Sequence, residues 1–267
     1  MRRQTLIALL LALCTAASAQ TATPADTLHQ ALADLRSATK GQNRFTYRDI
    51  RNQSLLDGHG RRTHSTARDY DVTWLGDKPY YKLIAEGGRE LTGHARDAEE
   101  NRYLNAVATR TKLVPTDTDI QNARAGVDLF RVIDIDYKLS VLRTETSPVG
   151  PVLVLQATPE ASATPATEGS CHWRYTIWIA LTPHMLQHYR ADAPDDAIEG
   201  CSTSTAEEWF KELDGLPYAY HFESHITHVH NGKDQGTTVS EDNMTSFRHF
   251  HAVADDSAPV DAPSTPN

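Results

Sequence analysis

The sequence predicts an α+β protein in which an antiparallel sheet is covered by helices. Runs such as Tyr70–Trp74 and Trp173–Ile179 alternate large apolar side chains with polar ones, which is the pattern of a strand with one buried face. Turn residues such as Gly76-Asp77 follow these runs, so neighbouring strands are expected to be joined by short hairpins. Apolar residues at helical spacing are found near residues 26–40 and, more weakly, near residues 94–112.

The start of the chain has the form of a secretory signal. The basic Met1–Arg3 precedes the apolar run Leu6–Leu13, which is too short to span a bilayer as a helix, and Ala17–Ala19 is an Ala-x-Ala cleavage site. We therefore expect residues 1–19 to be removed and the protein to be periplasmic or secreted. The alternative is lipid attachment at Cys14, but the residue before it is a leucine and such sites favour a small residue there.

The composition suits one globular domain, expected at residues 20–254, followed by a disordered Asp-, Ser-, Pro- and Thr-rich tail at residues 255–267. Without the signal, the chain keeps 24 basic and 35 acidic side chains, a formal charge of −11. An acidic chain without a basic cluster is a poor match for nucleic acid or for an anionic lipid surface. No transmembrane segment is expected after the signal is removed.

Two helices are expected to cover the sheet. The first runs from Asp26, its expected N-cap, to Lys40, and its apolar stripe of Leu28, Ala31, Leu32 and Leu35 must pack on the sheet. The second runs from His94 to Lys112 after a Thr92 N-cap, and its alanine-rich side, which includes Ala106, is expected to cover an edge or a mouth of the sheet.

The other segments fill in the sheet. Residues 118–130 are expected to form a short helix, residues 158–169 an exposed loop and residues 206–213 a helical turn. The expected strands are Phe45–Asp49, His64–Trp74, Tyr80–Ala85, Arg131–Leu142, Val152–Gln156, Cys171–Ala180, Met185–Arg190, Tyr218–Phe222 and Thr245–Val253.

Several local patterns, in the same order along the chain, resemble the LolA/LolB-like outer-membrane lipoprotein-sorting superfamily, in particular its secreted members. The patterns are Tyr70-Asp71-Val72, Leu75–Ile84, Glu86–Thr92 before a Glu-rich helix, Ile177-Trp178-Ile179 with Met185-Leu186, and Ser246–Phe250. The resemblance implies a strongly curved antiparallel sheet, an incomplete β-barrel, with helices on its concave side. It also implies an apolar cavity that receives an acyl chain, although function belongs to sites rather than to folds.

The expected ligand is therefore an apolar small molecule, a lipid or an acylated protein, held beneath the second helix. Aromatic residues on strands also form ordinary cores, and that alternative stays open here. The candidate cavity residues are Trp74, Tyr81, Trp173, Trp178, Phe222 and Ala106.

Histidines near the end of the chain offer a second kind of site. His228 and His230 point to one side of a strand, as do His249 and His251, so two paired strands could hold Zn²⁺ or Cu²⁺. A metal-dependent hydrolase is thus the alternative function, and a structural module of an envelope assembly is a third. Other catalytic patterns are weak: Ser37-x-x-Lys40 lacks companion motifs, and Asp134 with Asp136 fits a solvated strand face. We therefore expect a binding protein without a cofactor, and not an enzyme.

The sequence also predicts a disulfide between Cys171 and Cys201, the two cysteines that remain after signal removal in an oxidising compartment. The alternative is two separate buried thiols. The bridge would stabilise the fold by roughly 3 to 4 kcal/mol, because it closes a loop of about thirty residues in the unfolded chain. Thiol labelling of the unreduced, denatured protein should find no free thiol, and two labelled cysteines would contradict the bridge.

Overall fold

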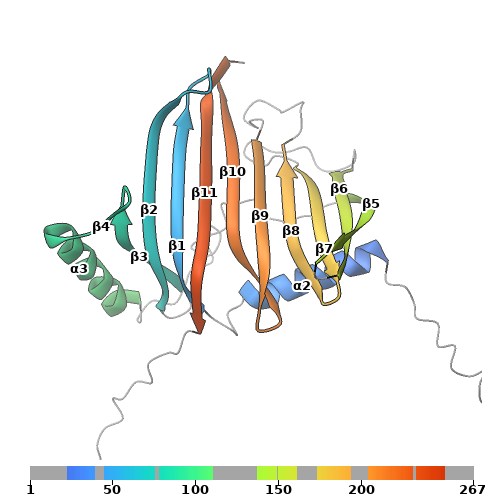
Figure 1. Cartoon of the computed structure of the whole chain (residues 1–267), viewed down its shortest axis with the longest axis horizontal. Helices are drawn as coiled ribbons and strands as arrows, with labels where there is room; N and C mark the ends of the chain where they lie inside the picture. The colour runs from blue at the N-terminus through green and yellow to red at the C-terminus, as the bar shows by residue number, and fades with distance from the viewer. Residues whose placement is uncertain are drawn as a thin grey trace, which may run out of the picture.

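The computed structural model describes residues 23–39, 45–75, 78–110, 137–148, 150–160, 173–193, 204–230 and 233–249. These residues form two helices and a single open antiparallel sheet of eleven strands (Figure 1). The sheet confirms the predicted α+β class and the predicted open, curved half-barrel. Its strand order is β4-β3-β2-β1-β11-β10-β9-β8-β7-β6-β5.

The sheet joins two meanders of unequal size. The first contains strands β1 to β4 and the second contains β5 to β11; they meet where β1 pairs with β11. The elements are α2 Pro24–Thr39, β1 Phe45–Leu56, β2 Arg62–Leu75, β3 Lys78–Glu86, β4 Arg89–Glu90, α3 Gly93–Arg110, β5 Tyr137–Ser147, β6 Gly150–Pro159, β7 Arg174–Leu181, β8 His184–Asp192, β9 Ser204–Leu213, β10 Leu216–His230 and β11 Lys233–His249.

Helix α2 builds the main core. Its leucines at positions 28, 32 and 35 are buried as predicted, and they pack with Ile177 and Leu186 of β7 and β8. The helix lies across the second meander (Figure 1). Its N-cap is Thr23 and not Asp26: the Thr23 hydroxyl accepts the backbone N–H of Asp26 at 3.1 Å, and the Asp26 carboxylate accepts the N–H of Thr23 at 3.1 Å. The two residues thus form a capping box.

Helix α3 contacts the opposite face of the sheet at its other end. Residues that are directly opposite in an antiparallel ladder point to the same face. The strand register therefore shows that Ile177, Phe222, Arg51 and Tyr81 all point to the face that α2 covers at one end. Tyr80, the next residue along β3, points the other way, and its ring lies 5.4 Å from the Tyr103 ring of α3. The α2 face next to β1, β2 and β3 is therefore not covered by α3.

Glu99 anchors α3 to the sheet edge. Its side chain is only 2% exposed and accepts hydrogen bonds from the Tyr80 hydroxyl at 3.3 Å and the backbone N–H of Leu83 at 3.2 Å. Arg102 forms an ion pair with the same carboxylate. None of the described helices is long and apolar enough to cross a membrane.

One expected element has a different structure. Residues 206–213 were expected to form a helical turn, but they belong to strand β9, which pairs with β8 and β10. Ala206 and Phe210 are buried on the α2 face, while Trp209 points to the opposite face. Pairing on both sides outweighs the helical preference of its Ala, Glu, Lys and Leu residues. The predicted helix 118–130 and loop residues 161–169 lie outside the described residues.

Replacing Leu32 by Ala should lower the free energy of unfolding by about 2 to 5 kcal/mol, because the side chain is 0% exposed and its loss leaves a cavity. Leu104 of α3 is 54% exposed, so the matched variant Leu104→Ala should change it by less than about 0.5 kcal/mol. Urea unfolding followed by circular dichroism measures both. Equal, small effects would show that α2 is peripheral.

Candidate functional site

The α2 face carries a cluster of interacting side chains around Arg51 of β1. The Arg51 guanidinium contacts the Asp49 carboxylate at 2.7 Å and the Asp242 carboxylate of β11 at 3.8 Å. It also lies 4.4 Å from the centroid of the Tyr81 ring and 5.2 Å from that of Tyr70, within the range of cation–π attraction. We call these five residues the Arg51 cluster.

Burial gives the Arg51 cluster unusual electrostatics. The Asp49 side chain is 1% exposed, and burial raises its pKa, although its hydrogen bond to Arg51 opposes the rise. Burial also acts against the charged guanidinium, but the hydrogen bond and attraction to Asp49 outweigh it and raise the pKa of Arg51. Arg51 thus stays charged, and its side chain remains 39% exposed. The cluster presents a fixed cation on the part of the α2 face that neither described helix covers, which we call the open part of this face.

A row of directly opposite residues links the Arg51 cluster to the core under α2. In register, Asp242 faces Phe222 of β10, Phe222 faces Glu208 of β9, and Glu208 faces the buried Tyr189 of β8. Burial raises the pKa of Glu208 to about 7, while its hydrogen bond with Tyr189 opposes the rise. Burial likewise raises the pKa of Asp242, and attraction to Arg51 opposes it. Phe222 therefore lies between two carboxyl groups whose pKa values are both raised by burial.

The opposite face carries a ladder of four rings, in which the first two pairs are stacked and the third is tilted by 48°. Trp178, His188, Trp209 and His221 belong to β7, β8, β9 and β10, and successive ring centroids are 4.3, 4.6 and 4.6 Å apart. His188 Nε2 lies 2.9 Å from the Glu207 carboxylate. Burial lowers the pKa of His188, and the hydrogen bond to Glu207 opposes this.

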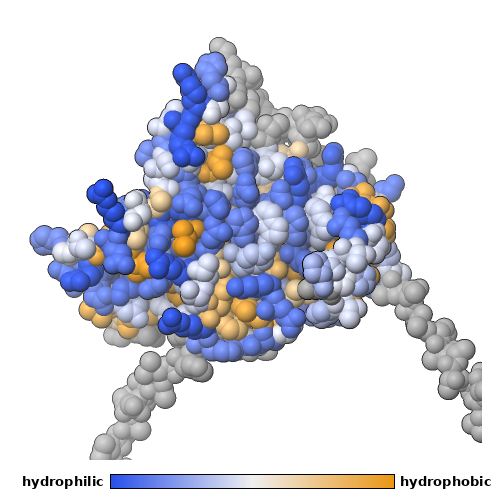
Figure 2. All heavy atoms as spheres, viewed as in Figure 1, coloured by the Kyte–Doolittle hydropathy of each residue, from blue (hydrophilic) through white to orange (hydrophobic). Residues whose placement is uncertain are grey.

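The surface seen in Figure 2 is mostly hydrophilic, with hydrophobic residues in separate small patches.

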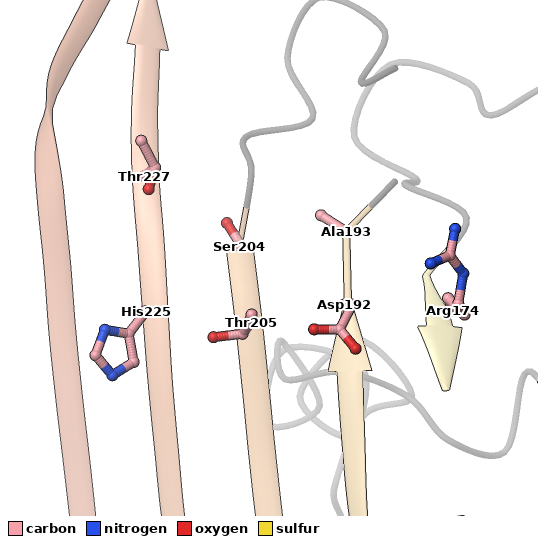
Figure 3. A pocket seen from close by; sticks show the side chains of 7 residues that line it. All are labelled: Arg174, Asp192, Ala193, Ser204, Thr205, His225 and Thr227. Carbon is pink, nitrogen blue, oxygen red and sulfur yellow. The ribbon is translucent and has the colours of Figure 1, made fainter. Parts of the chain in front are cut away.

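A polar pocket of about 500 Å³ lies at one end of strands β7 to β10. Arg174, Asp192, Thr205 and His225 form one row in register and contribute to its wall (Figure 3). Ala193, Ser204 and Thr227 complete the described lining. Its polar lining distinguishes this pocket from the apolar cavity that the sequence led us to expect.

The predicted cavity residues divide between the two faces. Trp74, Tyr81 and Phe222 lie on the open part of the α2 face, and the Trp74 indole N–H donates to the Phe45 carbonyl at 2.8 Å. Trp173 packs against the core under α2. Trp178 belongs to the ring ladder of the opposite face, and Ala106 lies half-buried on α3. The structure thus places three of the six on one face, with Phe222 four strands away from Tyr81, and a cavity under α3 stays a prediction.

The register separates the predicted metal-binding histidines. His228 is opposite Gly236 at one end of β11, whereas His249 is opposite Phe45 at the other end. His228 Nε2 lies 2.7 Å from the Thr238 hydroxyl, and His249 Nε2 lies 3.5 Å from the Asp214 carboxylate. The side chain of His230 and all of His251 lie outside the described residues. Within the described ranges, no group of three or more His, Cys, Asp or Glu is placed to hold a metal ion.

The remaining predicted residues lie outside the described part of the chain. These residues are Cys14, Cys171, Cys201, Asp134 and Asp136, so the disulfide stays a prediction. Sequence reasoning missed Asp49, Arg51, Asp242 and Glu208. Asp49 and Arg51 alternate with the same period as Phe45 and Tyr47, so they point to the same face of β1. Charged residues at positions expected to be buried were the signal in the sequence that could have identified this site.

Comparisons with known proteins find similar solved structures. A LolA superfamily protein from Nitrosomonas europaea matches with a TM-score of 0.37 and 11% identity over 83% of this chain and 94% of its own. A DUF1329 family protein from Desulfovibrio piger matches with a TM-score of 0.37 and 11% identity over 86% and 95%. An outer membrane lipoprotein-sorting protein domain from Vibrio parahaemolyticus, described as putative, matches with a TM-score of 0.38 and 10% identity over 85% and 95%. The first and third of these carry the names of the superfamily that the sequence motifs resemble. No protein family and no curated protein matches the sequence.

Glu208 should make stability depend on pH. Its pKa of about 7 in the folded protein lies above its ordinary value of 4.5, so between these values the folded state keeps a proton that the unfolded chain has released. The free energy of unfolding should therefore fall as pH rises through this window. Glu208→Gln removes the titration. From about pH 5 to about pH 8 the wild type should lose roughly 2 to 3 kcal/mol more than this variant.

Chemical unfolding at several pH values measures this difference. Glu223→Gln is the control, because that carboxylate belongs to the opposite face and its side chain is 43% exposed. The control variant should follow the wild-type profile. Parallel profiles for the wild type and Glu208→Gln would contradict the raised pKa.

Proposed function

We propose that this protein binds an apolar, chain-bearing small molecule on the part of the α2 face formed by β1, β2, β3, β11 and β10. The observation that carries the proposal is an exposed aromatic floor on a face whose other half is already buried by α2. Tyr81 is 37% exposed, and Tyr47, Tyr70 and Phe222 are half-buried on the same face. Exposed aromatic surface on a folded protein often marks a binding site.

The floor has the chemistry of a ligand-binding surface and not of a core. Tyr47 shares a hydrogen bond with Tyr81, and burial raises the pKa of Tyr47. Val72, directly opposite both tyrosines, is 1% exposed. Val72 points to the same face as these tyrosines, so the floor combines a buried aliphatic side chain with the accessible ring of Tyr81. A bound chain would cover this half of the face, as α2 covers the other half.

Burial of a chain can supply adequate affinity. Each methylene removed from water contributes about 0.8 kcal/mol, so ten contribute roughly 8 kcal/mol before the ordering costs of binding. Micromolar affinity is reachable after those costs. The structures named above as lipoprotein-sorting proteins are consistent with such a ligand, which would be a lipid or the acyl part of an acylated protein.

We further propose binding and not catalysis, in a domain of residues 20–254 that acts in the periplasm or outside the cell. The signal-like residues 1–19 support this location. Support for a binding role comes from the Arg51 cluster, whose guanidinium is held by carboxylates and rings instead of being placed beside a nucleophile.

The uncharged probe N-phenyl-1-naphthylamine tests the proposal. Its fluorescence should rise saturably with protein, and dodecanol should displace it. Tyr81→Ala should weaken binding about tenfold, because it removes an accessible ring from the floor and so about 1.4 kcal/mol of binding free energy. Trp178→Ala is the matched control on the opposite face and should bind as the wild type does. Absence of saturable binding, or equal loss in both variants, would contradict the proposed surface.

A further inference from the structure

We propose that the ligand of this face carries a cationic head group, such as a protonated amine, on its apolar chain. The inference rests on the proposed function and adds the charge of the head group to it. Three observations support it: the way in which Arg51 is held, the surplus of carboxylates on the row that crosses the sheet, and the position of Phe222 between two of them.

The face already shows how it binds an organic cation. The Arg51 guanidinium lies over the rings of Tyr81 and Tyr70 while Asp49 and Asp242 approach it from the side. Aromatic rings attract cations through their negative faces, and carboxylates add hydrogen bonds and Coulomb attraction. The same combination of rings and carboxylates recognises ammonium ligands.

Acidic groups outnumber basic groups on and beside this row. Asp49, Asp242 and Glu208 supply three carboxylates, and Arg51 is the cation that contacts the first two of them. Arg68, directly opposite Arg51, is itself paired with Glu86 at 3.0 Å. Among the described residues, Glu208 has the Tyr189 hydroxyl as its partner and no cation. A ligand cation would balance the remaining charge.

Asp49 adds an unused acceptor to this surplus. Its Oδ2 binds Arg51, but its Oδ1 is buried and has no hydrogen-bond partner among the described residues. A buried carboxylate oxygen without a partner is costly, so this atom favours further positive charge or N–H donors on the face. Asp49 lies two strands from Phe222 and is not itself the contact of the proposed head group. An amine brings up to three N–H donors, whereas a carboxylate head group brings none.

Phe222 marks the position of the head group. Asp242 and Glu208 are its direct neighbours on the two adjacent strands, each about 4.8 Å away across the sheet. An ammonium within about 6 Å of the Phe222 ring centroid is therefore close to both carboxylates. The chain of the ligand would then extend over the tyrosines of β1, β2 and β3. A carboxylate placed there would be repelled by both neighbours.

Three ligands with the same chain test the inference. Dodecylamine, dodecanol and dodecanoate are titrated below their micelle concentrations, at about pH 8, by displacement of N-phenyl-1-naphthylamine. Dodecylamine should bind at least about tenfold more tightly than dodecanoate, with dodecanol between them, because only the amine gains from the carboxylates. Added salt should reduce this difference by screening.

Two matched variants locate the head group. Asp242→Asn removes one carboxylate beside Phe222 and should reduce the preference for dodecylamine over dodecanoate several-fold. Glu241→Gln changes the adjacent residue of β11, which points to the opposite face, and should leave the preference unchanged. Glu208→Gln should act as Asp242→Asn does, which provides a second variant if one of them is poorly folded.

The outcomes separate the two proposals. No saturable binding of any of the three ligands would contradict the proposed function itself. Saturable binding of all three with equal affinity, or tighter binding of dodecanoate, would overturn the cationic head group and leave the apolar surface standing. An unchanged preference in both Asp242→Asn and Glu208→Gln would also overturn it, because the head group would then lie elsewhere.

Discussion

The pairing of β1 with β11 is the contact on which the rest of the structure depends. It runs from Phe45 opposite His249 to Leu56 opposite Thr237 and is the junction between the two meanders of the sheet. The two strands are so close at Gly236 that a side-chain Cβ there would lie 2.2 Å from the Leu56 carbonyl oxygen, so only glycine fits. Because the partners are nearly two hundred residues apart, closing this ladder carries a large loop-closure cost. The same register places Arg51 opposite Asp242 and so assembles the site.

The architecture could be predicted from local patterns, because alternate residues of a strand point to one buried face. Val72 and Ile177 sit at buried positions that alternation alone indicates, and the leucines of α2 follow helical spacing. Strand pairing between distant segments has no local signal. The expected last strand began at Thr245, whereas β11 begins at Lys233, so Asp242 fell outside the expected sheet. The segment Ala206-Glu207-Glu208 inside β9 favoured a helical turn, so Glu208 was not expected on the sheet.

The candidate site depends on that same long-range register. Tyr81 and Phe222 were predicted as ligand residues from their type, but their common face follows only from four successive strand pairings. Trp178, predicted for the same cavity, belongs to the other face because it alternates with the buried Ile177 and Ile179. A buried ion pair such as Asp49 with Arg51 is weak support for stability, since desolvation offsets much of its attraction. Its presence on an open, aromatic face is better explained by ligand binding.

The central claim is that the ligand lies on the open part of the α2 face, and photoaffinity labelling tests it most directly. A dodecylamine that carries a diazirine near the end of its chain is cross-linked to the protein, and the labelled residues are identified by peptide mass spectrometry. Labels should concentrate on β1, β2, β3 and β10, at or beside Tyr47, Tyr70, Tyr81 and Phe222, and excess dodecylamine should suppress them. Suppressible labels that concentrate instead on Trp178, Trp209 and their neighbours on the opposite face would contradict the account.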